Sequence, residues 1–202
     1  MLRNTALVAA LVSITCLTAC AHDVVWLADE PTPWIPPREP VGLAIAVSVQ
    51  SFEAKRLVEK PYVDRFATAL RESELFRGVI YPIPEGFEPL WELKLLVRDE
   101  LYDPNSNLWK SALATMLLPL RFVLYQQEDY TVHVEALITR RDQVIGSYPA
   151  DAPVRHRFQA YDLRKELEAA ELIVRRSTDQ ILGAIAADAD RLNAEDRRLA
   201  GS

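Results

Sequence analysis

Apolar residues recur with a period of two in two stretches of this chain, and that pattern constrains its fold more than any other feature. The stretch 41–49 alternates large apolar residues with small ones, and the stretch 130–139 alternates apolar residues with mainly polar ones. Successive side chains of a strand point to opposite faces, so both stretches are predicted to be strands with one buried face. Arg141-Asp142 then predicts a tight turn into a strand over 144–148, which completes an antiparallel pair.

Two other stretches have the spacing of amphipathic helices. Over 60–76, a proline in the first turn precedes apolar residues at every third or fourth position, and Gly78 follows. Over about 163–192, an apolar stripe with the same spacing runs through charged residues. Each stretch is therefore predicted to be one helix. The second stripe fits packing on a sheet or pairing with another helix.

A short apolar run follows at 79–83, and the stretches 90–97 and 154–158 predict further strands, although Pro149 and Pro153 weaken the last one. The order of strand, helix, several mostly antiparallel strands and helix predicts an α+β fold. In this fold, a mostly antiparallel sheet carries two amphipathic helices packed on one face.

A single domain is expected over residues 41–193. Half of the chain (50%) is hydrophobic, which is enough for a core at this length. The remaining residues, 194–202, form a polar C-terminal tail that is expected to fray.

The N-terminus has the pattern of an export signal. Arg3 supplies a positive charge, and the stretch 5–15 is apolar or small and carries no charge. This run is shorter than the roughly 20 residues that a helix needs to cross a bilayer. We therefore expect a cleaved signal rather than a permanent span.

The export signal ends in Leu17-Thr18-Ala19-Cys20, which resembles the lipobox of bacterial lipoproteins. The resemblance implies a signal peptide over residues 1–19, cleavage after Ala19, and N-acyl and S-diacylglycerol groups on Cys20. Three acyl chains hold a protein on a membrane far more firmly than one. In this family an aspartate after the cysteine favours the inner membrane. Position 21 is alanine here, so the resemblance implies an outer-membrane lipoprotein that faces the periplasm.

Cysteine usage and charge narrow the possibilities further. Cys16 leaves with the signal and Cys20 carries lipid, so the mature domain is expected to fold on its hydrophobic core without a disulfide. The net charge of −6 disfavours nucleic acid as a partner, because neutralising phosphates requires an excess of lysine and arginine.

Residues 20–40 are predicted to be the lipidated cysteine followed by a proline-rich tether. Five prolines between positions 31 and 40 disfavour a long helix or a central strand. In extended geometry the tether would hold the domain up to roughly 60 Å from the lipid. Trp26 and Trp34 lie in this segment, where they either contact the membrane interface or fold back onto the domain.

The stretch 109–125 is the most apolar part of the chain after the signal, and Pro119 divides it. It is too short to span a bilayer as a helix, so we interpret it as part of the core. The alternative is that residues 112–124 contact lipid or a protein partner. The centre of that contact would be Met116, Leu117 and Leu118.

The sequence contains no GxSxG, HExxH, CxxC, P-loop or glycine-rich dinucleotide motif. No two histidines share one element at the spacing of metal ligands; the three are His22, His133 and His156. We therefore predict no catalytic residue, no metal, and no cofactor beyond the lipid on Cys20.

Two charged clusters are the remaining candidates for a site. The first, Asp99, Glu100 and Asp103, lacks the ordered oxygen ligands of a calcium loop and is expected to be a solvated turn. The second runs from Arg155 to Arg157 around His156. It is interpreted as a solvated edge, with an acidic partner as the alternative.

Three functions remain as hypotheses. The favoured one is a non-catalytic accessory or assembly subunit of an envelope complex, with an envelope protein as partner. The alternatives are a carrier or sensor for lipid or another apolar ligand, and an envelope hydrolase with a diffuse carboxylate site. The architecture resembles that of small α/β periplasmic accessory lipoproteins, although no specific motif carries this resemblance. The sequence does not decide the oligomeric state.

Overall fold

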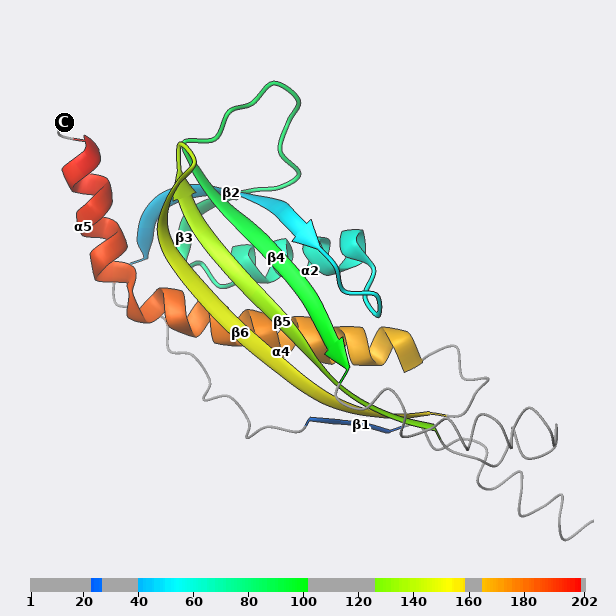
Figure 1. The fold of residues 1–202 in the computed structure, drawn as a ribbon. Helices are drawn as coiled ribbons and strands as arrows, with labels where there is room; N and C mark the ends of the chain where they lie inside the picture. Colours follow the sequence, from blue (N-terminus) through cyan, green and yellow to red (C-terminus); the bar gives the residue numbers. More distant parts are fainter. Residues whose placement is uncertain (1–22, 27–39, 102–125, 159–164, 201–202) are drawn as a thin grey trace, which may run out of the picture.

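The computed structural model describes residues 23–26, 40–101, 126–158 and 165–200. Within them, six strands form one sheet in the order β1-β6-β5-β4-β2-β3 (Figure 1). The strands are β1 (Asp23–Trp26), β2 (Val41–Phe52), β3 (Phe76–Ile80), β4 (Trp91–Leu101), β5 (Gln126–Arg140) and β6 (Gln143–Phe158). The helices are α2 (Glu59–Glu72), α4 (Lys165–Ala187) and α5 (Ala189–Ala200). No described helix has the length and apolar character needed to cross a membrane.

The sheet is mixed, with antiparallel pairing in its longest part. β4, β5, β6 and β1 pair antiparallel in succession, whereas β2 pairs parallel with both β3 and β4. Helix α2 connects β2 to the parallel strand β3, as a crossover must, because parallel neighbours cannot be joined by a tight turn. The predicted α+β class, with a mostly antiparallel sheet and helices on one face, is confirmed.

The core lies between the sheet and helices α2 and α4. The face of β5 predicted to be buried is buried, and its apolar residues alternate with less buried ones; they are Val132, Val134, Ala136 and Ile138. Ile173, Ile181 and Ile185 of α4 are fully buried against the sheet layer. The predicted turn also forms: Arg141 and Asp142 have φ angles of 45° and 67°, the left-handed geometry of a tight hairpin.

The helix predicted over 60–76 ends earlier than expected. α2 stops at Glu72, and Phe76 is the first residue of β3. The apolar spacing continues through Phe76, but the backbone leaves the helix because Ser73 bonds the carbonyl of Leu70 and Glu74 has a φ of 52°. The prediction that this helix reaches residue 76 was wrong.

The long helix predicted over 163–192 is two helices that meet at Asp188. The Asp188 carboxylate accepts hydrogen bonds from the Tyr148 hydroxyl at 2.7 Å and from Arg191, which fixes the chain to β6 at this point. α5 then packs beside β2. There the side-chain oxygen of Asn193 accepts a hydrogen bond from the backbone N–H of Gly42 at 2.8 Å.

The tail predicted to fray is helical as far as Ala200. Trp91 donates its indole N–H to Asp196 at 3.2 Å, and Arg198 pairs with Glu195 one turn earlier. The Trp91 bond ties the last helix to the start of β4, a long-range contact that the composition of residues 194–200 does not reveal, whereas the Arg198–Glu195 pair lies within α5.

β6 is one continuous strand that includes Pro149 and Pro153, although these prolines were expected to weaken it. Asp151 lies between them, and its amide donates away from β5, to Gln180 of α4 at 3.2 Å. Positions 149 and 153 have the same parity, so their missing N–H groups also face away from β5. The prolines therefore cost the β5–β6 ladder no hydrogen bond, and they blunt the outer edge of β6.

Four residues of the predicted tether belong to the sheet. β1 pairs antiparallel with β6, from Asp23 opposite Arg157 to Trp26 opposite Val154. The expectation that the whole of residues 20–40 is a free extended tether is therefore corrected: it does not hold for 23–26. The prolines lie after β1, so they do not prevent its pairing.

Candidate binding face of the sheet

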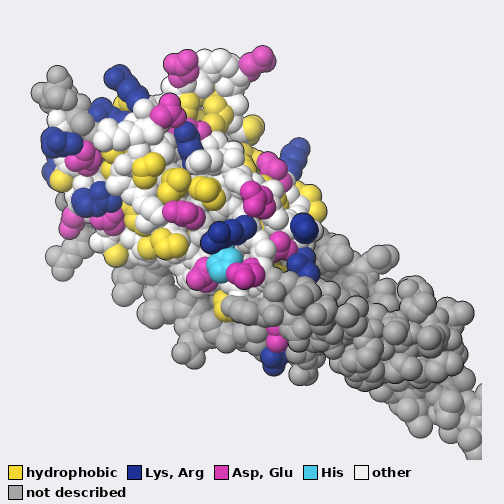
Figure 2. All heavy atoms as spheres, viewed as in Figure 1, with side chains coloured by type: hydrophobic (Ala, Val, Ile, Leu, Met, Phe, Trp, Pro, Cys, Tyr) yellow, Lys and Arg dark blue, Asp and Glu magenta, His cyan; other side chains and the backbone are white. Residues whose placement is uncertain are grey.

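One face of the sheet is covered by helices and the other is not covered by any described helix. Figure 1 shows α2 and α4 behind the sheet, and Figure 2 shows the uncovered face from the same direction, with hydrophobic side chains and charges of both signs intermingled. We call the following residues the open face, because they alternate with core residues in β4, β5 and β6: Glu92, Lys94, Leu96, Arg98, Glu100, His133, Glu135, Leu137, Pro149 and Asp151.

His133 is a polar group of the open face with a carboxylate beside each of its ring nitrogens. Its Nδ1 lies 2.7 Å from a carboxylate oxygen of Asp151, and its Nε2 lies 3.5 Å from one of Glu100. Register explains this arrangement, since His133 pairs with Asp151 on β6 and with Arg98 on β4, two positions before Glu100. The imidazole side chain is 26% exposed and is therefore held in one orientation while still facing solvent.

Asp151 is itself held from the helical layer. The side-chain amide of Gln180 on α4 accepts the Asp151 N–H at 3.2 Å and donates to the Asp151 carbonyl at 3.3 Å. These two bonds fix the backbone of the residue whose carboxylate orients His133. The open face is thus braced by α4, although α4 packs on the other face of the sheet.

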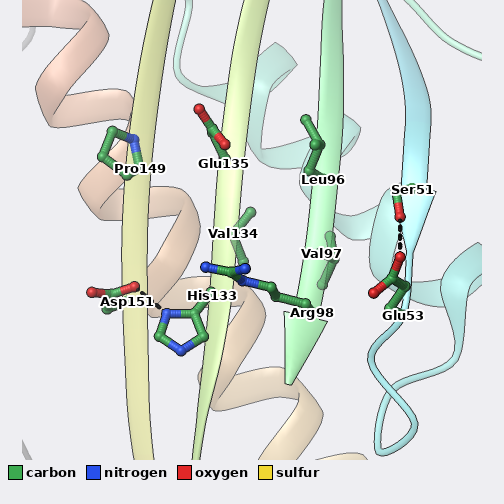
Figure 3. A pocket seen from close by; sticks show the side chains of 10 residues that line it. All are labelled: Ser51, Glu53, Leu96, Val97, Arg98, His133, Val134, Glu135, Pro149 and Asp151. Atoms are coloured by element: carbon green, nitrogen blue, oxygen red, sulfur yellow. Dashed lines mark hydrogen bonds and ion pairs between the residues drawn. The ribbon is translucent and has the colours of Figure 1, made fainter. Parts of the chain in front are cut away.

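A shallow pocket of about 310 Å³ lies beside His133. Figure 3 shows the Arg98 side chain extending from β4 toward β5, with its guanidinium beside the His133 ring. Arg98 has neither an ion pair nor a hydrogen bond from its side chain to the part of the chain that the structure describes, and it is exposed. The pocket also contains three carboxylates, those of Glu53, Glu135 and Asp151.

Other charges around the open face are paired. Lys94 bonds Asp142 at 2.8 Å, and this bond raises the pKa of Lys94 and lowers the pKa of Asp142. Arg155 makes a bidentate pair with Asp129 at 2.7 and 3.0 Å, and that hydrogen bond raises the Arg155 pKa. An exposed arginine such as Arg98, with no partner in the described part of the chain, is a group that an external carboxylate can satisfy.

The serine hydroxyls of this surface are used in local bonds. Ser51 donates to Glu53 at 3.2 Å, and Ser147 donates to Glu135 at 2.6 Å. Neither bonds the His133 ring, whose two nitrogens face carboxylates. Among the described residues, no group of three or more histidine, cysteine, aspartate or glutamate side chains is arranged to hold a metal ion.

The acidic cluster predicted to be a solvated turn is partly a strand, so that prediction was wrong for two of its three residues. Asp99 and Glu100 belong to β4, and Asp103 lies outside the described residues. The side chain of Asp99 is only 6% exposed and pairs with Arg56 at 3.0 Å, whereas Glu100 faces His133. A run of charged residues is typical of a turn, but here the backbone of Asp99 and Glu100 pairs with β5 and extends the strand β4.

The basic run around His156 lies on β6. The Arg155 charge is satisfied by Asp129 and is not free for an acidic partner. His156 and Arg157 stand at register positions opposite Val24 and Asp23 of β1.

Most of the other predicted site residues cannot be compared with the structure. Six of them lie outside the described residues: the lipid attachment site Cys20, the cleavage site Ala19, Trp34, and the predicted apolar contact of Met116, Leu117 and Leu118. Trp26 is placed by its backbone in β1. The period-two alternation of residues 130–139 predicts that His133 lies on the polar face of its strand. The pattern of that stretch does not indicate that Asp151, Glu100 and Arg98 lie around it.

No protein-family model matches this chain, and no curated protein matches its sequence. Among solved structures, it is similar to a Xanthomonas campestris protein of the DUF330 family, with a TM-score of 0.44, 12% identity, and 83% of this chain and 97% of that chain covered. It is also similar to a candidate lipoprotein from Caulobacter crescentus (TM-score 0.35, 11% identity, 74% and 91% covered). A third is PelC from Paraburkholderia phytofirmans, a dodecamer (TM-score 0.33, 16% identity, 79% and 98% covered). All three TM-scores are below 0.5, and we draw nothing about function from them.

Proposed function

We propose that this chain is a non-catalytic accessory subunit of a bacterial envelope complex. Lipid on Cys20 anchors it to the outer membrane, on the periplasmic side, and the open face of the sheet binds a protein partner. The lipobox and Ala21 support the anchor and its membrane. The observation that carries the binding role is Arg98, whose exposed guanidinium has no partner among the described residues and lies within a polar surface of the sheet.

The open face has the composition of a protein-binding surface. Leu96 and Leu137 are half-buried there, while Val144 at its margin is 54% exposed. Interfaces combine such apolar contacts with a polar rim, and arginine is enriched among the residues that dominate binding energy. Because His133 and Asp151 are already ordered, binding loses little side-chain entropy at these positions.

The charges around Arg98 define the chemistry of the partner. A partner carboxylate can form a bidentate pair with the guanidinium. Glu53, Glu135 and Asp151 surround the same pocket and would repel additional acidic groups. The partner segment therefore carries a single carboxylate next to Arg98, flanked by neutral or basic residues.

Crosslinking in living cells tests the binding role. A photo-crosslinking amino acid at Leu96 is expected to capture one envelope protein, whereas the same amino acid at Arg175 of α4 is not. Both positions are described, but Arg175 is exposed on the helical layer. Crosslinks that are absent from both positions, or that are identical at the two, contradict the proposal.

Charge reversal then measures the role of Arg98 in the captured complex. Arg98→Glu is expected to weaken binding by about 2 kcal/mol, roughly 30-fold, as for a central interface arginine. Arg175→Glu makes the same charge change on the other layer and should leave the affinity within about twofold of the original. Equal weakening by both substitutions would indicate a general electrostatic effect and refute the assignment of the open face.

The anchor has its own test, which uses the two cysteines of the precursor. Cys20→Ser should abolish labelling by radioactive palmitate and release the protein from membranes, whereas Cys16→Ser should change neither. Ala21→Asp should move the lipidated protein from the outer-membrane to the inner-membrane fraction of a density gradient. Palmitate labelling that survives Cys20→Ser would exclude this anchor.

A further inference from the structure

β1 lies closer in sequence to the proposed lipid anchor than any other described element. Asp23 follows Cys20 by three residues, and three extended residues span at most about 11 Å. β1 runs antiparallel to β6, and Asp23 pairs with Arg157, one residue before β6 ends at Phe158. The chain therefore leads back to Cys20 from the end of the sheet that is opposite the β5–β6 turn (Figure 1).

We infer that this end of the domain faces the phospholipid bilayer and that the β5–β6 turn points away from it. We call the end formed by Asp23, Gln126 and Phe158 the anchor pole, and the end formed by the Arg141-Asp142 turn the distal pole. The inference rests on the proposed lipidation of Cys20. A lipid anchor alone fixes neither the orientation of the domain nor its distance from the bilayer. The inference specifies both.

The proline-rich segment does not separate the lipid from the domain. It begins after Trp26 in β1 and ends before Val41 in β2, and both strands belong to the same sheet. Its length therefore adds nothing to the distance between lipid and sheet. The largest distance between the lipid and the sheet is therefore about 11 Å, compared with the roughly 60 Å expected of a free tether.

The connectivity of the central strands supports the same orientation. β4 ends at Leu101 and β5 begins at Gln126, and both positions are toward the anchor pole. The intervening chain, which includes the apolar stretch 109–125, therefore leaves and re-enters the sheet at that pole. The stretch that is most apolar after the signal is thus joined to the sheet at the end that we place nearest the lipid.

Charge does not determine this orientation. At the anchor pole, Arg155 is paired with Asp129. The register sets Arg157 opposite Asp23, and His156 opposite Glu128. With no excess of positive charge among these positions, attraction to anionic headgroups is weak. The orientation should therefore be the same on neutral and on anionic bilayers.

Spin labels at the two poles test the orientation in the full lipidated chain. After processing, the chain has no free thiol, so Gln127→Cys and Gln143→Cys each provide a single labelling site. Position 143 pairs with 140, and the thirteen residue-to-residue steps of β5 from 127 to 140 span about 44 Å. The probe is a lipid whose headgroup carries a nickel chelate, which relaxes nitroxides near the bilayer surface.

Relaxation several-fold stronger at position 127 than at position 143 is expected, both in phosphatidylcholine vesicles and in vesicles that also contain phosphatidylglycerol. Equal relaxation at the two positions, or stronger relaxation at position 143, overturns the orientation. Intact-mass measurement of the same samples separates the two proposals. An acylated protein with equal relaxation refutes only the orientation, whereas a protein without acyl groups refutes the anchor on which the inference rests.

Matched insertions test the role of β1. Twelve Gly/Ser residues inserted between Ala21 and His22 lengthen the link to fifteen residues, about 21 Å root-mean-square, and should reduce the relaxation at position 127. The same insertion between Pro36 and Pro37, after β1, should leave the relaxation unchanged. A loss of relaxation caused only by the second insertion would show that the proline-rich segment is the link.

Discussion

A buried hydrogen bond joins the two helices that cover the sheet. It predicts that a double variant lacking both hydroxyls is more stable than one of the two single variants. The hydroxyl of Tyr62 on α2 lies 3.0 Å from that of Ser177 on α4, and both side chains are almost fully buried. Ser177 also donates to the carbonyl of Ile173 at 2.7 Å. With its one proton used there, Ser177 must accept the bond from Tyr62. Burial raises the pKa of Tyr62, so its hydroxyl keeps the proton that it donates.

The two single substitutions therefore differ in what they leave behind. Tyr62→Phe removes the donor, keeps the ring and leaves Ser177 bonded to Ile173, which should cost about 1 kcal/mol. Ser177→Ala deletes a smaller group but leaves the buried Tyr62 hydroxyl without an acceptor, which should cost about 2 kcal/mol. In the double variant no hydroxyl is left unsatisfied, so it should be more stable than Ser177→Ala alone.

Urea denaturation and thermal unfolding, both followed by circular dichroism, measure these differences as free energies of unfolding and as Tm values. For a chain of this size, a change of 1 kcal/mol corresponds to a shift in Tm of about 2–4 °C. The control is Thr68→Ala on α2, because the Thr68 hydroxyl is exposed and bonds only the carbonyl of Asp64 within its own helix. The reasoning is refuted if Tyr62→Phe is the more damaging single change, or if the double variant shows the sum of the two costs.

Three further outcomes follow from the contacts around β6. Hydrogen bonding from Arg191 lowers the pKa of Asp188, so Asp188 stabilises the fold above its ordinary pKa and loses that effect as the pH falls through the lowered one. Asp188→Asn should cost about 1 kcal/mol at pH 7, and urea titrations should show the difference shrinking below about pH 5. Gln180→Ala should speed amide hydrogen exchange at Asp151 about fivefold, since one bond of about 1 kcal/mol is lost; unchanged exchange would remove Gln180 as the brace of the open face. Arg141→Asn should raise the free energy of unfolding by about 0.5 kcal/mol, because asparagine tolerates positive φ better; a lower Tm would contradict the turn geometry.

Alternation predicted the faces of the strands correctly where the chain pairs regularly. The buried face of β5 and the Arg141-Asp142 turn follow from local pattern, because period two and turn geometry are local properties. The errors occur where long-range contacts override local pattern. Phe76 continues a helical spacing, yet it belongs to β3 because that strand pairs with β2. Pro149 appears unsuited to a strand until the register shows that its missing N–H would face away from β5, where no ladder bond is lost.

The candidate site was less predictable than the fold, for the same reason. The polar face of β5 indicated that His133 is not in the core. Its carboxylate neighbours come from β4 and β6, and the sequence does not reveal a register between strands. Glu100 was assigned to a turn because it belongs to a charged run, whereas pairing with β5 extends β4 as far as Leu101. An ordered cluster built across three strands becomes visible only when the sheet is assembled.

The inferred orientation of the domain and the proposed role of Arg98 together limit where the proposed partner can bind. Arg98 stands opposite His133 in the strand register. His133 is seven residues along β5 from Gln126 at the anchor pole. Those residues span about 24 Å, and the link from Cys20 adds about 11 Å. The partner must therefore offer its carboxylate no more than roughly 35 Å above the bilayer. A tether of roughly 60 Å would have allowed contacts far across the periplasm. With the proposed anchor joined to the sheet through β1, we instead expect a partner that rises from, or lies close to, the same membrane.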